Sequence, residues 1–69
     1  MKFYIEIITP MGMFKGEVLD GSEEEYETIK NSVKNVFKDD FFEADLQDGS
    51  YITLNNVVIQ QSIFKIVKH

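Results

Sequence analysis

Residues 2–9 and 13–19 alternate between two sets of side chains, as expected for β-strands, whose successive side chains point to opposite faces. The segment between them, Thr9-Pro10-Met11-Gly12, has proline and glycine at positions that favour a type I turn. The two segments are therefore predicted to form a hairpin. Gly16, inside the second segment, predicts a bulge or a sharp bend.

A single helical pattern follows, from Ser22 to Lys38. Ser22 and Glu25 have the spacing of a capping box, in which each side chain accepts a hydrogen bond from the other residue's backbone N–H. Acidic residues crowd the first turns and lysines the later ones, which suits the helix dipole. The apolar residues fall within one arc at 3.6 residues per turn, so this face is predicted to be buried, in particular Ile29, Val33 and Phe37.

The rest of the chain returns to a period of two. Residues 41–46 and 50–54 are predicted strands, joined by the hairpin sequence Asp48-Gly49. Residues 57–61 fit either a strand or a single 3₁₀-like turn across the end of the sheet, and residues 62–68 form a last strand. The hydrophobic spacing of this ending resembles the final two strands of SH3-like small barrels, and no function is carried over from that resemblance.

These patterns predict an α+β fold in a single domain spanning residues 1–69. A single helix packs on a curved, mainly antiparallel sheet of four to five strands, in the order β-β-α-β-β-β. A small SH3-like open barrel is the alternative arrangement of the same elements. A chain of this length has a thin core, because a small domain buries only a modest share of its surface.

The residues present argue against catalysis and against a cofactor. The chain has no cysteine, and its one histidine is the last residue, His69. A thiolate metal site is thus excluded, and a Ser–His–Asp arrangement is not expected at a chain end. No glycine-rich phosphate loop is present. We therefore expect a protein that is not an enzyme, with no catalytic, cofactor-binding or metal site.

The charge distribution argues against nucleic acid as a partner. The net charge is −5, from twelve acidic residues and seven lysines, and there is no arginine. Arginine is the usual residue for bidentate contacts to guanine or phosphate, and negative charge repels the nucleic-acid backbone. The acidic runs at 17–27 and 39–48 are interpreted as solvated surface and helix capping. An acidic patch for a basic partner and weak divalent-cation binding are the alternatives.

Membrane association is not expected either. No apolar run approaches the roughly 18 residues of a membrane span, and the N-terminal residues do not resemble a secretory signal. We therefore expect a cytoplasmic location.

The most informative feature is that the predicted strands carry apolar residues on both faces. One helix covers one face, and the bare face of an antiparallel sheet is normally polar. Either the sheet curls into a barrel that buries the second set, or another chain covers it. The second face is predicted to carry Tyr4, Ile8, Met13 and Leu19, with Tyr51 or Ile63 as further members.

The sequence thus favours a non-enzymatic protein-interaction module. It would be a homo-oligomer, most simply a homodimer, or a small adaptor or inhibitor that binds a larger protein. The size and the lack of catalytic groups would suit an accessory protein of a compact genome, such as a phage. The alternative function is that of a nucleic-acid-binding small barrel.

Overall fold

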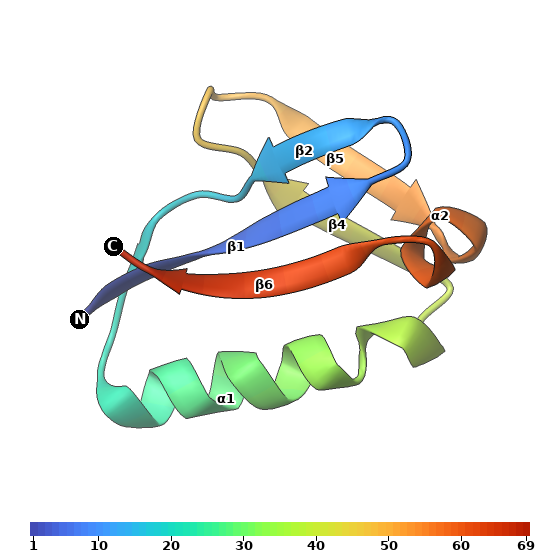
Figure 1. The fold of residues 1–69 in the computed structure, drawn as a ribbon. Coiled ribbons are helices and arrows are strands. Elements are labelled where there is room, and N and C mark those ends of the chain that lie inside the picture. The colour runs from blue at the N-terminus through green and yellow to red at the C-terminus, as the bar shows by residue number, and fades with distance from the viewer.

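Two antiparallel sheets and one long helix make up the chain in a computed structural model, which describes all 69 residues (Figure 1). The predicted order of elements is confirmed, and the ambiguous segment at 57–61 lies mainly in a short helix, α2. The elements are β1 (Lys2–Thr9), β2 (Gly12–Lys15), β3 (Leu19–Asp20), α1 (Glu23–Lys34), the 3₁₀ turn η1 (Val36–Lys38), β4 (Phe41–Asp45), β5 (Tyr51–Asn55), α2 (Asn56–Gln60) and β6 (Ile63–Lys68).

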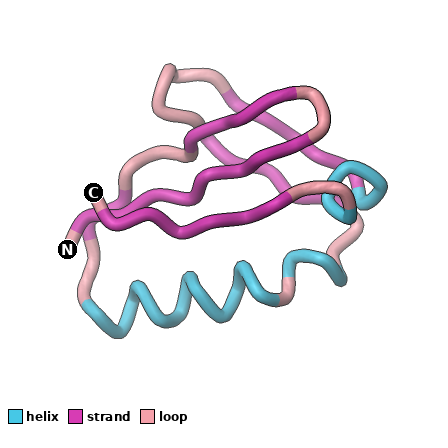
Figure 2. The backbone as a smooth tube through the Cα atoms, in the orientation of Figure 1, coloured by secondary structure: helices cyan, strands magenta, loops and turns pink.

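The first sheet is built around β1. This strand pairs antiparallel with β2 and β3 along one edge and with β6 along the other (Figure 2). Directly opposed residues of antiparallel strands point to the same face. Ile7 is opposed by Phe14 and Phe64, so these three side chains share the inner face with Phe3 and Ile5.

The second sheet is the β4–β5 hairpin, which crosses behind the first sheet in Figure 1. Its turn confirms the hairpin predicted at Asp48-Gly49: Gly49 has φ of 87°, a backbone conformation that glycine adopts without steric cost. Phe42, Ile52 and Leu54 point toward the first sheet. The buried core between the layers consists of Ile7, Val36, Leu54 and Ile59.

Gly16 is where the first sheet contacts the second. Its backbone N–H donates to the Ile5 carbonyl oxygen at 2.7 Å, and it forms an isolated antiparallel bridge with Leu46. A Cβ atom at this position would lie 3.0 Å from the Ile5 oxygen, which is closer than an ordinary van der Waals contact. Of the two features predicted at Gly16, a bulge or a sharp bend, the bulge is confirmed by the change in register between β2 and β3. The two sheets meet at this bridge, and the strands do not close into a barrel.

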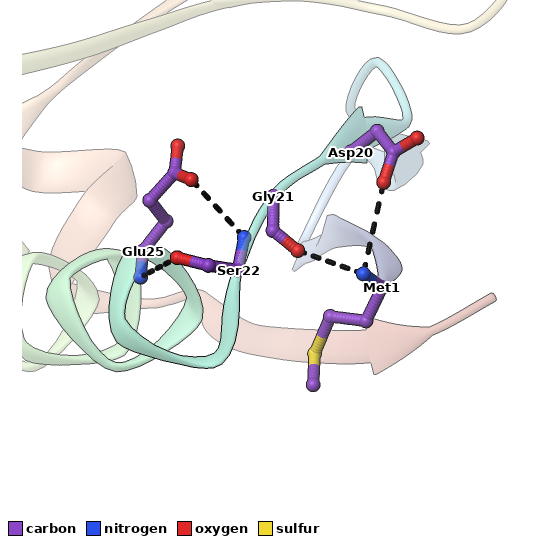
Figure 3. Close-up of polar contacts among 5 residues, drawn as sticks. All are labelled: Met1, Asp20, Gly21, Ser22 and Glu25. Carbon is purple, nitrogen blue, oxygen red and sulfur yellow. Dashed lines mark hydrogen bonds and ion pairs between the residues drawn. The ribbon is translucent and has the colours of Figure 1, made fainter.

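The N-terminus of α1 is fixed by the predicted capping box (Figure 3). The Glu25 N–H donates to Ser22 Oγ at 3.2 Å, and the Ser22 N–H donates to Glu25 Oε1 at 3.1 Å. The amino group of Met1 donates to the Gly21 carbonyl oxygen at 2.7 Å and lies 3.7 Å from Asp20 Oδ1. The start of the helix is therefore held against the start of β1.

The buried face of the helix differs from the prediction. Ile29 and Val33 are only half-buried, Phe37 is 40% exposed, and the one fully buried residue of this segment is Val36. Val36 takes the buried position predicted for Phe37 because α1 ends at Lys34 and the following 3₁₀ turn, with three residues per turn, changes which side chain faces the core. Phe37 instead packs edge-on against Phe64, with ring centroids 5.7 Å apart.

The capping box predicts a measurable loss of stability for Ser22→Ala. The substitution leaves the Glu25 N–H without its acceptor and should lower the free energy of unfolding by about 1 kcal/mol in urea titrations. Ser22→Asp should recover most of this loss, because aspartate is an equally good N-cap. Equal stability of the alanine variant and the parent would contradict the assignment.

The short helix α2 offers a matched test of the core. Ile59 is fully buried, whereas Val57, two residues earlier, is 67% exposed. Ile59→Ala should cost about 2–5 kcal/mol of unfolding free energy through lost burial and the cavity left behind. Val57→Ala should change it by less than about 0.5 kcal/mol. Similar losses of unfolding free energy in both variants would mean that Ile59 is not the buried residue of α2.

Candidate functional site

The surface of the first sheet that points away from the core is covered by no other element. The helix packs on the inner side, where Tyr26 lies edge-on to Phe3 at 5.3 Å, and the second sheet packs there against Ile7. The curling of the strands therefore does not bury this outer surface. We call it the front face; its side chains are Lys2, Tyr4, Glu6, Ile8, Met13, Lys15, Asp20, Ile63, Lys65 and Val67.

An apolar row crosses the front face from β6 to β2. Ile8 is directly opposed by Ile63 on one side and by Met13 on the other, so the three side chains are contiguous. Ile63 is 59% exposed and Met13 is 58% exposed. A second apolar pair, Tyr4 with Val67, lies further along the same two strands. Large apolar side chains thus occupy the face that is polar in a typical open antiparallel sheet.

A charged row separates these two apolar groups. Glu6 is opposed by Lys65 on β6 and by Lys15 on β2, and Lys65 Nζ lies 3.5 Å from Glu6 Oε1. The side chain of Glu6 is only 12% exposed, whereas that of Lys65 is 54% exposed. The carboxylate lies low against the sheet, and an approaching molecule meets the two lysines.

Three of the four predicted interaction residues lie together on the front face. Tyr4, Ile8 and Met13 are placed as expected, and Ile63 joins them. The placement of Leu19 on this face is wrong: it is directly opposed by Phe3 and therefore points to the inner side.

A one-residue bulge explains the error. Gly16 is hydrogen-bonded to Ile5 and Leu19 is opposed by Phe3, so Glu17 and Val18 together oppose Tyr4 alone. One extra residue moves every later side chain of the strand to the other face. Gly16 indicates this bulge in the sequence, but strict alternation through residues 13–19 predicts the wrong face for Leu19.

Tyr51, the other suggested member, lies on the far side of the molecule. It belongs to the outer surface of the second sheet, where it is opposed by Asp45 and its hydroxyl donates to Glu43. We call this surface the back face; its side chains are Phe41, Glu43, Asp45, Tyr51, Thr53 and Asn55. Beside it, the hydroxyl and then the backbone N–H of Ser50 donate to Asp48 and hold the pKa of its carboxyl group below the ordinary value.

Two hollows lie away from the front face. One, of about 190 Å³, separates β1 from β4 and is bordered by Leu19 together with the exposed carboxylates of Glu17 and Asp45. The other, of about 370 Å³, lies between α1 and β6 and has Lys30 and Lys34 among otherwise aromatic and aliphatic side chains. No histidine, serine or threonine borders either hollow.

The remaining candidate groups stand apart from one another. His69 is exposed and lies edge-on to Tyr4, with ring centroids 6.3 Å apart. No three histidine, aspartate or glutamate side chains are grouped so that they could hold a metal ion. Neither helix has both the length and the apolar composition that crossing a bilayer requires. No protein-family model, curated protein or solved structure matches the chain.

The open front face predicts that a charge is tolerated there in the folded monomer. Met13→Lys should leave the unfolding free energy within about 0.5 kcal/mol of the parent, because the side chain already lies mostly in water. Ile7→Lys, on the fully buried inner face of the neighbouring strand, should prevent folding. Circular dichroism and urea titration test both. Unfolding of the Met13 variant would mean that this side chain is buried after all.

Proposed function

We propose that this protein is a non-enzymatic protein-interaction module whose front face docks against another protein chain, most simply a second copy. The observation that carries the proposal is the row of Ile63, Ile8 and Met13, which no part of its own chain covers. Contiguous apolar surface in water is unfavourable, at roughly 25 cal/mol per Å², and in folded proteins it commonly marks an interface.

The arrangement of apolar and charged side chains on the front face is typical of a protein–protein interface. Apolar side chains at its two ends provide area to bury, and the lysines between them provide directional contacts for carboxylates. The Glu6 carboxylate already has a cation at 3.5 Å within its own chain, so docking would not leave it without a partner.

We propose a non-enzymatic role because the chain offers few side chains that could carry out catalysis. Acid–base or nucleophilic catalysis needs a reactive group held in position by a neighbour. Glu17 and Asp45 border the same hollow but are both exposed, and no serine, threonine or histidine lies beside them. A binding role therefore explains the exposed apolar row of the front face, which an enzymatic role does not.

The alternative of a nucleic-acid-binding small barrel has less in its favour. The three front-face lysines each lie opposite a carboxylate, that of Glu6 or Asp20, and the chain as a whole carries −5. Phosphate contacts normally supply most of the affinity for nucleic acid. Salt-dependent retention on immobilised DNA would support this alternative, and passage without retention would support the protein-interaction module.

Ile63→Asp tests the proposal directly. A carboxylate in a docked apolar row would lose its hydration without gaining a partner. The association constant of the purified protein, measured by sedimentation equilibrium, should fall at least about tenfold, which corresponds to about 1.4 kcal/mol.

Val57→Asp is the matched control, because Val57 is an equally exposed aliphatic residue on α2, away from the front face. Its association constant should equal that of the parent. A parent protein that stays monomeric at about 1 mM would remove the basis for self-association. If it also captured no partner from a lysate, the interaction module would be ruled out.

A further inference from the structure

Charge is unevenly divided along the chain. Five of the twelve acidic residues and none of the seven lysines lie between residues 39 and 64, so the remaining seven acids and seven lysines cancel. The whole net charge of −5 thus belongs to the part of the chain that contains β4, β5 and the back face. The front face, by contrast, has three lysines against two carboxylates, those of Glu6 and Asp20.

The back face also carries exposed aromatic side chains. Phe41 is 55% exposed and Tyr51 is 56% exposed. Both lie on the same side of the hairpin as Glu43 and Asp45, because odd-numbered residues of the two strands are opposed in pairs. The Tyr51 hydroxyl donates to Glu43, which holds the ring and the carboxylate next to each other. The back face therefore combines apolar rings with carboxylates, whereas the front face combines aliphatic side chains with lysines.

Two copies can meet in three ways, and the charges favour only one of them. Contact of front face with front face brings six lysines and four carboxylates together, and contact of back face with back face brings four carboxylates together with no lysine. Contact of a front face with a back face places Lys15 and Lys65 against carboxylates such as Asp45. Opposite charges across an interface steer association, while like charges oppose it.

We infer that copies of this chain associate head to tail, with the front face of one copy docked on the back face of the next. This inference rests on the proposed function and specifies the partner surface. The inner sides of the two sheets share one core, so the front and back faces lie on opposite sides of the molecule. A docked pair therefore leaves one free front face and one free back face, and such a heterologous contact continues into an open stack.

Two single-face variants test the inference. Ile63→Asp blocks the front face and leaves the back face intact. Asp45→Lys places a lysine on the back face, where it would meet the lysines of a docked front face, and leaves the front face intact. Glu27→Lys, on the exposed side of α1, is the control for the same change in net charge. Sedimentation velocity of each protein alone, and of an equimolar mixture of the two variants, gives the mass of the species formed.

We expect the parent and the Glu27 control to form species that grow beyond a dimer with concentration. Each single-face variant alone should associate at least about tenfold more weakly than the parent, since every contact uses one front and one back face. The mixture should form a one-to-one dimer through the two intact faces and stop there. If the Asp45→Lys variant alone associates as strongly as the parent, head-to-tail stacking is overturned and the proposed function still stands. Ile63→Asp that associates as well as the parent would overturn both.

Discussion

The arrangement of the two sheets depends on the close approach of Gly16 to the Ile5 carbonyl oxygen. The 2.7 Å hydrogen bond holds the end of β2 against β1, while the next peptide group donates to Asp45 of the second sheet. A side chain at this position would contact the Ile5 oxygen at 3.0 Å and force the strands apart. The bulge beside Gly16 also decides which face each later residue of the segment takes, and it places Leu19 on the inner side.

The core that results is small and depends on a few residues from distant parts of the chain. Ile7, Val36, Leu54 and Ile59 come from a strand of the first sheet, the 3₁₀ turn, the second sheet and the short helix. The helix α1 contributes no fully buried residue. Tyr26 of α1 makes an aromatic edge contact with Phe3, Phe37 of the following 3₁₀ turn makes one with Phe64, and the capping box fixes where the helix begins. Such contacts position the helix on the inner side and leave the front face open.

This division of the molecule explains why its two outer surfaces have different chemistry. The side chains of the inner faces are buried in the core, which does not constrain the side chains of the outer faces. The front face combines aliphatic side chains with lysines, and the back face combines aromatic rings with carboxylates. Each surface is unusual for a sheet exposed to water. Together they form a complementary pair on opposite sides of one small domain, which is the arrangement that head-to-tail association requires.

The sequence alone determined the order of elements, the hairpin at Asp48-Gly49 and the helix start at Ser22, because these depend on neighbouring residues and on a regular period. It also placed Tyr4, Ile8 and Met13 on one face, since β1 and β2 alternate without interruption up to Gly16. Leu19 and Phe37 were misplaced because a bulge and a change from α to 3₁₀ geometry each shift the phase of the side chains. Only the tertiary structure decided whether the second apolar set lies inside a barrel or in water. That choice depends on where the helix and the β4–β5 hairpin dock, which involves contacts between residues far apart in the chain.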